Sequence, residues 1–210
     1  MPMRVIGGEA RGRPLRTLKG SETRPTADKV KGAIFSMIES AFFRLGREEG
    51  WEGRRVLDLY AGTGALGIEA LSRGAARADF VEHASIACAV IADNLRRTGL
   101  ADRGQVHCLA VAAALARSDV LVGPYDLILL DPPYSDPALT AVVRSVLGGP
   151  LVSDTTIVVV EHAKHASLDE EHGKLRRFRL RTHGHTSLSI YGPPELSDAQ
   201  DDQDVLEQSD

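Results

Sequence analysis

Hydrophobic and polar residues follow two alternating periods along the chain. Short apolar runs typical of buried β-strands occur at residues 55–60, 76–83, 105–110, 126–134 and 155–162. Segments with apolar residues three or four apart, which predict helices, lie at about 27–44, 68–74, 85–99, 111–118 and 137–147. From residue 55 onward, strands and helices alternate. This rhythm predicts an α/β fold with a doubly wound, mainly parallel sheet that carries helices on both faces.

The two ends of the chain depart from this rhythm. Residues 3–18 place short alternating runs around glycine and proline turn residues, which predicts a small N-terminal β-hairpin. Residues 174–183 and 186–192 predict a C-terminal antiparallel hairpin at the sheet edge. The last residues are rich in Asp, Gln and Ser and too polar to bury a core. We therefore expect a basic hairpin at 1–22, an α/β domain at 23–194 and a disordered acidic tail at 195–210.

Composition favours a reduced, soluble, cytoplasmic protein. Cys88 and Cys108 are the only cysteines, and they do not form a CxxC pair. The seven histidines show no zinc-binding spacing, so we expect no metal site. Apolar runs fall short of the roughly 20 residues of a membrane span, and the basic N-terminus lacks the apolar stretch of a signal peptide. We expect no membrane partner.

The net charge of −4 conceals a basic body, because the last sixteen residues carry seven acids and no Lys or Arg. Residues 1–31 hold eight basic and three acidic residues. Such a concentration is typical of a surface that binds a polyanion, although a solvated surface is the alternative. The candidate backbone-binding residues are Arg4, Arg11, Arg13, Arg16, Lys19, Lys29 and Lys31.

A glycine-rich loop follows the first strand of the α/β region and opens a helix. Residues 62–67 fit the pattern GxGxxG, and Glu82 lies 20 residues beyond Gly62 at the end of the next strand. Glycines let a ligand approach the backbone closely, and a carboxylate at that position can accept hydrogen bonds from both hydroxyls of a ribose. The pattern therefore indicates a ligand that contains adenosine.

Asp58 distinguishes between two such ligands. Its charge, four residues before Gly62, would repel the pyrophosphate of a dinucleotide but suits the amino and sulfonium groups of S-adenosylmethionine. We favour the methyl donor, with a dinucleotide or a purely structural turn as alternatives. After the third strand, residues 108–111 offer no Asp or Asn, so backbone atoms would hold the adenine. The candidate donor-binding residues are Asp58, Gly62, Thr63, Gly64 and Glu82.

The fourth strand ends in Asp131-Pro132-Pro133-Tyr134, at the edge of the sheet where ligands bind in doubly wound folds. An exocyclic amine on a base is a poor nucleophile, and it gains positive charge when it attacks a methyl group. Asp131 and the Pro132 carbonyl can accept its hydrogens, while the two prolines stiffen the loop. Tyr134 can stack on the base. The alternative is a proline-rich turn without a ligand.

Taken in order, these segments resemble one family. Residues 4–8 and 11–13, the run Thr23-Arg24-Pro25-Thr26, the glycine loop and residues 131–134 are similar to the RsmD-type bacterial ribosomal RNA guanine-N2 methyltransferases, over about residues 3–192. The resemblance implies a class I methyltransferase (Rossmann-like) fold, S-adenosylmethionine as cofactor, and methylation of one guanine in small-subunit ribosomal RNA. It also implies that Arg24 and Thr26 lie near the methionine end of the donor.

The resemblance makes ribosomal RNA the expected partner, free or within an assembled small subunit, and we expect a monomer. A DNA amino-methyltransferase is the nearest alternative, but no large target-recognition insertion is present, which favours RNA. A non-catalytic RNA-binding protein on the same fold and a nicotinamide oxidoreductase are further alternatives. Arg177, Arg179 and Arg181 are expected on one strand face, where they would extend the basic surface.

Overall fold

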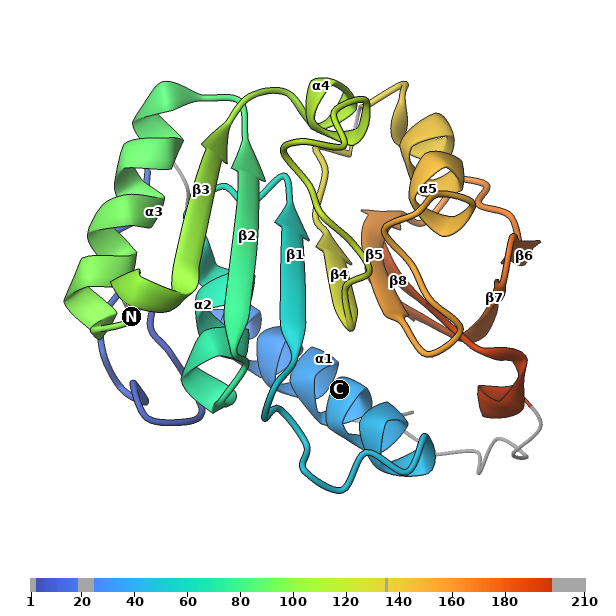
Figure 1. The fold of residues 1–210 in the computed structure, drawn as a ribbon, viewed down its shortest axis with the longest axis horizontal. Helices are drawn as coiled ribbons and strands as arrows, with labels where there is room; N and C mark the ends of the chain where they lie inside the picture. The colour runs from blue at the N-terminus through green and yellow to red at the C-terminus, as the bar shows by residue number, and fades with distance from the viewer. Residues whose placement is uncertain (1–2, 19–24, 135, 198–210) are drawn as a thin grey trace.

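The computed structural model describes residues 3–18, 25–134 and 136–197, without the side chains of residues 25–29. Its centre is an eight-stranded sheet in the order β3-β2-β1-β4-β5-β8-β7-β6 (Figure 1). Strands β1 to β5 are parallel, and β6, β7 and β8 close the sheet with antiparallel pairing. The strands are β1 (Arg55–Leu59), β2 (Arg77–Glu82), β3 (Gly104–Cys108), β4 (Leu127–Leu130), β5 (Ile157–Ala163), β6 (Glu171–His172), β7 (Leu175–His183) and β8 (Thr186–Gly192).

Helices cover both faces of the sheet and create two hydrophobic cores. The first core joins α1, α2 and α3 to one face, and the second joins α4 and α5 to the other. The central strands are apolar throughout because both of their faces are buried, as in Leu127–Leu130. The predicted fold class is confirmed. The helices are α1 (Pro25–Arg44), α2 (Ala65–Arg73), α3 (Ser85–Thr98), α4 (Val111–Leu115) and α5 (Leu139–Leu147), with short 3₁₀ turns at Ala101–Arg103 and Pro194–Leu196.

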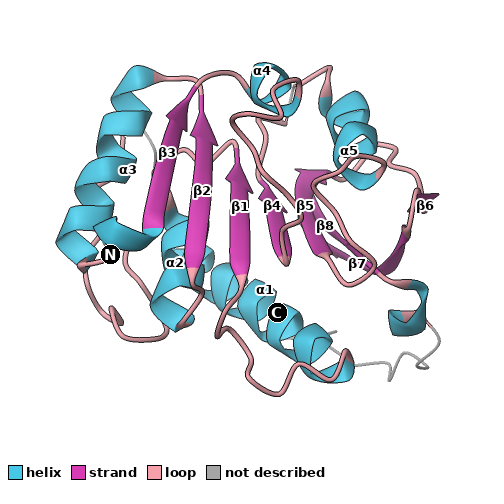
Figure 2. Cartoon of the chain, in the orientation of Figure 1, coloured by secondary structure: helices cyan, strands magenta, loops and turns pink. Residues whose placement is uncertain are grey.

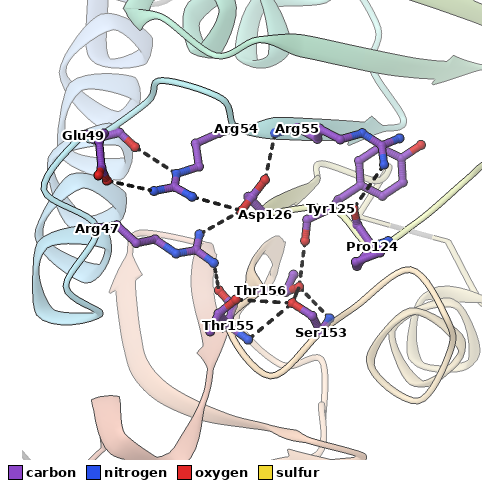
Figure 3. Close-up of polar contacts among 11 residues, drawn as sticks. Arg47, Glu49, Arg54, Arg55, Pro124, Tyr125, Asp126, Ser153, Thr155 and Thr156 are labelled. Carbon is purple, nitrogen blue, oxygen red and sulfur yellow. Dashed lines mark hydrogen bonds and ion pairs between the residues drawn. The ribbon is translucent and has the colours of Figure 1, made fainter.

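Asp126 lies at the amino ends of β1 and β4, where it contacts several arginines (Figure 3). Its carboxylate accepts the backbone N–H of Arg55 at 2.9 Å and pairs with Arg47 at 3.2 Å and Arg54 at 3.5 Å. Arg47 also donates to the backbone carbonyl of Thr155, next to β5, at 2.8 Å. These contacts tie the loop after α1 to three strands. An acid at this edge of the sheet is therefore neutralised by neighbouring guanidinium groups.

The N-terminal segment, residues 3–18, is an irregular loop in place of the regular β-hairpin expected from the sequence (Figure 2). One antiparallel bridge joins Arg4 to Pro14, and Val5 and Arg13 share a backbone hydrogen bond. The chain does turn back on itself as predicted, but it forms no ladder of strands within these residues. The turn and proline chemistry was recognised correctly, whereas the alternating runs were too short to pair along their length.

Contacts with α2 and α3 replace the missing strand pairing. Glu69 of α2 is fully buried and accepts the backbone N–H groups of Ile6 and Gly7 at 2.9 and 2.7 Å. Gly8, at φ 72°, lies so close to α2 that an added Cβ would meet the Ser72 carbonyl at 1.7 Å. The segment also buries Val5, Ala10 and Leu15 in the core shared with the helices. It is therefore part of the main body, and the predicted boundary at residue 22 lies outside the described residues.

Asn94 of α3 connects this segment to the glycine loop. Its side chain is fully buried and exchanges two hydrogen bonds with the backbone of Arg16, at 2.7 and 3.1 Å. The same amide donates to the carbonyl of Thr63 at 2.9 Å. One side chain thus holds the N-terminal segment and the loop after β1 in a fixed relation.

Three details of the sequence-based expectation are corrected. Helix α1 begins at Pro25, a residue type favoured at helix starts, and so before the start at about residue 27 that the sequence predicts. A bulge between Arg177 and Arg179 places Arg177 opposite Tyr191 and Arg179 opposite Ile190, hence on opposite faces of β7. The folded chain continues into the expected tail, because the turn Pro194–Leu196 buries Leu196 in the first core.

We expect Asn94→Ala to lower the free energy of unfolding by about 1–3 kcal/mol, because it leaves buried backbone groups of Arg16 and Thr63 unpaired. The N-terminal segment should also become a faster site of proteolysis than in the parent protein. Urea denaturation and limited proteolysis measure the two effects. Arg96→Ala on the exposed side of α3 serves as the control, with a change below about 0.5 kcal/mol. Equal stability of both variants would contradict this role of Asn94.

Candidate active site

Four carboxyl groups gather where β1, β2, β4 and β5 approach their carboxyl ends. In the sheet register Asp58 is level with Phe80 and Leu129, and Glu161 is opposite Leu188, so Asp58, Glu82 and Glu161 share the face covered by α1, α2 and α3. Asp131 directly follows β4. The site lies at the point where the strand order reverses, between β1 and β4, which is where open α/β sheets bind ligands.

The glycine loop turns sharply at the end of β1. Gly62 and Gly64 have φ angles of 53° and 76°, and Tyr60 also has a positive φ of 61°, which is unusual for a side chain of its size. Glu82 fixes this turn, because its carboxylate accepts the N–H of Gly62 at 3.0 Å and that of Ala84 at 2.8 Å. Glu82 therefore joins the end of β2 to the loop, in the position predicted for a ribose contact.

Gly67 lets α2 pack directly against β1 and β2. A Cβ at this position would lie 2.3 Å from the Phe80 ring and 3.1 Å from a carboxylate oxygen of Asp58. Because glycine has no side chain, the backbone comes close enough for the Gly67 N–H to donate to the Asp58 carboxylate at 2.9 Å. The third glycine of the motif thus serves helix packing, while the space beside Gly62 is open, with only the Tyr60 carbonyl near an added Cβ, at 3.9 Å.

Asp58 is 1% exposed, and its burial determines its charge. Desolvation is the main cause that raises its pKa to about 7; the Gly67 hydrogen bond opposes the rise, while the charges of Asp131 and Glu82 add to it. At neutral pH the carboxyl is therefore divided between its charged and protonated forms. A cation brought next to it would favour the charged form.

Asp131 has a similar pKa although its surface is open to solvent. Desolvation by the surrounding protein raises the pKa of Asp131 to about 7, and the charge of Glu161 adds to the rise. Pro132 is buried and anchors the loop, whereas Pro133 and Tyr134 are exposed. Asp131, Pro133 and Tyr134 of the predicted amine site are thus exposed, while Pro132 is buried.

The hydroxyl of Tyr134 is fixed at two points. It donates to Glu161 at 3.1 Å and shares a hydrogen bond with the Thr186 hydroxyl at 2.6 Å. The residue remains 55% exposed, so a planar group has access to its ring. No sequence pattern indicated a role for Glu161 or Thr186, since both come from strands whose pairing no local pattern reveals.

Tyr60 makes a second contact that sequence reasoning missed. Its hydroxyl donates to Asp136 at 2.9 Å, and Asp136 in turn accepts the N–H of Ala138 ahead of α5. The loop after β1 is therefore connected to the loop after β4. Desolvation and the Asp136 contact raise the pKa of Tyr60 well above its usual value, so the hydroxyl keeps the proton that it donates.

The remaining donor-site candidates have mixed outcomes. Thr63 turns its hydroxyl toward the Met3 sulfur, at 3.6 Å, and so contacts the N-terminal segment. Arg24 lies outside the described residues, and for Thr26 only the helical backbone is described. Their predicted contacts with the methionine end of a donor stay predictions.

Among the predicted polyanion contacts, Arg4, Arg11, Arg13 and Arg16 are exposed. Lys31 is a correction: it is 6% exposed, donates to the Arg4 carbonyl at 2.7 Å and pairs with buried Glu69 at 3.2 Å. A buried acid needs a paired cation, so Lys31 serves the interior and is not available to RNA. Lys19 lies outside the described residues, as does the side chain of Lys29.

Comparisons with known proteins identify the family of the chain and its relatives. Residues 3–192 match the model of the family described as Conserved hypothetical protein 95. A putative rRNA methyltransferase YlbH of Bacillus subtilis is 37% identical over 90% of this chain and 98% of its own. Ribosomal RNA small subunit methyltransferase D of Escherichia coli K12 is 25% identical, with 90% and 89% covered. The solved structure of a putative methyltransferase yhhF from Escherichia coli is 26% identical with a TM-score of 0.75, covering 92% and 98%.

None of the described helices is long and apolar enough to cross a membrane.

We expect the stability conferred by Asp58 to depend on pH in a defined direction. Because its pKa rises from 3.8 to about 7 on folding, the folded state loses stability as pH increases from about 4 to about 7, and the cost is complete above that range. Asp58→Asn removes this titration. Its free energy of unfolding relative to the parent should increase by up to about 4 kcal/mol between pH 4.5 and pH 8. Denaturant titrations at both pH values test this; a difference that stays constant would contradict the assignment.

Proposed function

The chain belongs to the Conserved hypothetical protein 95 family, the family of RsmD-type ribosomal RNA methyltransferases, and from this premise we propose that it methylates the exocyclic N2 amine of a guanine in small-subunit ribosomal RNA. The observation that carries the proposal is the position of Asp131 next to Asp58, close enough for the charge of one to raise the pKa of the other. A donor site and an amine site therefore meet at one sheet edge.

The residues at the end of β1 fit S-adenosylmethionine. Asp58, Glu82 and Asp131 concentrate negative charge that a sulfonium and an amino group would relieve, whereas a pyrophosphate would increase the repulsion. Glu82 lies at the end of β2, where a carboxylate can accept ribose hydroxyls, and the loop at Gly62 leaves open space. When bound, the donor supplies an electrophilic methyl group.

The loop after β4 supplies what an aromatic amine needs. Asp131 and the Pro132 carbonyl are proposed to accept the two amine hydrogens, which favours the pyramidal nitrogen that attacks and stabilises the positive charge that it acquires. The exposed Tyr134 ring would stack on the base and offset part of the cost of drawing it from its neighbours. With its hydroxyl held by Glu161 and Thr186, the ring would position the amine next to Asp58.

Features outside the site favour RNA as the substrate. The relatives named as rRNA methyltransferases match along the whole length of their chains or nearly so. The exposed arginines of the N-terminal segment, Arg4, Arg11, Arg13 and Arg16, offer contacts for a phosphate backbone. We place the RNA across this segment and the carboxyl edge of the sheet.

We expect Asp131→Ala to abolish turnover, because the amine then lacks the acceptor that stabilises its developing charge. Asp131→Asn should keep measurable activity, since its amide oxygen still accepts a hydrogen bond without the full charge. Single-turnover assays with saturating labelled donor, small subunits from cells lacking the gene, and identification of the methylated nucleoside measure both variants. Free RNA and DNA serve as alternative substrates in the same assay.

Titration calorimetry with S-adenosylmethionine is the control for this experiment, and both Asp131 variants should retain most of the donor affinity. Activity of Asp131→Ala near that of the parent would refute the amine-site assignment. Methylated adenine or cytosine in DNA, in place of methylguanine in RNA, would identify the nearest alternative enzyme.

We expect Arg11→Ala combined with Arg13→Ala to weaken RNA binding and to reduce the slope of log affinity against log salt by about 1.4–1.8, the equivalent of two phosphate contacts. Fluorescence anisotropy with a labelled ribosomal RNA fragment measures this slope. Arg117→Ala, an exposed arginine after α4, is the matched control and should leave the slope unchanged. An unaltered slope in the double variant would show that Arg11 and Arg13 are ordinary solvated side chains that do not contact RNA.

A further inference from the structure

A cavity of about 570 Å³ adjoins the proposed amine site at the end of β5. It is lined by Tyr134, Ala163, Lys164, His165 and His185. In the register of β5 and β8, Ala163 is opposite Thr186, the residue that binds the Tyr134 hydroxyl. Lys164 and His185 come immediately beyond this pair, and the Lys164 N–H donates to the His185 carbonyl at 2.9 Å. The walls of the cavity are thus held in place relative to the Tyr134 ring.

The chemistry of this cavity differs from that of the neighbouring site. The ends of β1, β2, β4 and β5 carry Asp58, Glu82, Asp131 and Glu161, which repel phosphate. Lys164 is exposed and brings an ammonium group, and the exposed rings of His165 and His185 bring N–H donors. Cationic and hydrogen-bonding groups therefore lie next to an acidic site, which suits an anion that must stay close to that site.

We propose that this cavity binds the phosphate and ribose of the nucleotide whose base stacks on Tyr134, or of its direct neighbour in the RNA strand. A base drawn from its stack stays attached to its sugar and phosphate, and these must leave the acidic edge while the amine remains beside Asp131. Lys164 neutralises the phosphate charge, and His165 and His185 donate to its oxygens or pack on the ribose. This inference rests on the proposed function and adds a second RNA contact, separate from the N-terminal segment.

Lys164→Ala, compared with Lys164→Arg and Lys174→Ala, tests the inference. Lys174 is a matched exposed lysine that pairs with Asp154. It precedes the nine-residue strand β7, so it lies about 30 Å from His183 at the other end of that strand, two residues before His185 of the cavity. Binding of a labelled ribosomal RNA fragment is measured by anisotropy across a salt series, with methylation kinetics and donor calorimetry in parallel.

Lys164→Ala should weaken RNA binding and raise the KM for RNA about five- to tenfold, with kcat and donor affinity close to those of the parent. Its salt slope should fall by about 0.7–0.9, as expected for one phosphate contact. Lys164→Arg should restore most of the affinity, and Lys174→Ala should change neither quantity. A triple variant that joins His165→Ala and His185→Ala to Lys164→Ala should raise the KM for RNA further than Lys164→Ala alone.

Unchanged RNA affinity and salt slope in Lys164→Ala, with methylguanine still formed by the parent, would overturn the inference and leave the proposed function standing. Absence of methylguanine from the parent's reaction would overturn the proposed function instead. In that case a reduced slope in Lys164→Ala would still identify a phosphate contact at this cavity, because the binding measurement does not depend on turnover.

Discussion

The parallel register of β1 with β2 and β4 is the constraint on which the site depends. It brings the strand ends together, so that Asp58, Glu82 and Asp131 meet although they are distant in the chain. Desolvation, together with the charge of neighbouring carboxyls, raises the pKa values of Asp58 and Asp131 to about 7, a cost that the hydrophobic strands must offset. A cationic ligand relieves this cost. The same carboxyls therefore lower the stability of the fold by itself and favour a positively charged donor.

Acidic side chains have opposite surroundings at the amino ends and at the carboxyl ends of the parallel strands. At the amino edge, Asp126 is surrounded by Arg47 and Arg54 and serves the fold alone. At the carboxyl edge, Asp58 and Asp131 have carboxyl neighbours that raise their pKa. A carboxylate paired with arginines stabilises the fold, whereas a carboxyl next to other carboxyls is available to bind a cationic ligand. This contrast marks the functional edge independently of any motif.

The N-terminal segment couples the outer surface to the site. Buried Glu69 accepts its backbone N–H groups and pairs with Lys31, while Asn94 joins Arg16 to the carbonyl of Thr63 in the glycine loop. The exposed arginines are thus carried on a segment that is fastened to the donor loop. RNA bound to this segment would therefore be held in a fixed position relative to the donor loop.

The amino-acid sequence by itself determined the alternation of strands and helices from β1 to β5, the C-terminal hairpin of β7 and β8, the fold class and the positions of Asp58, Gly62, Glu82 and Asp131 near strand ends, because hydrophobic period and glycine spacing are local signals. It also predicted α3 and β8 almost to the residue. It did not predict the short strand β6. Only the tertiary structure decided which distant groups pair. Lys31 turns inward because a buried Glu69 needs a cation, and Glu161 joins Tyr134 because β5 packs between β4 and β8. Such pairings join residues far apart in the chain, and no local pattern records them.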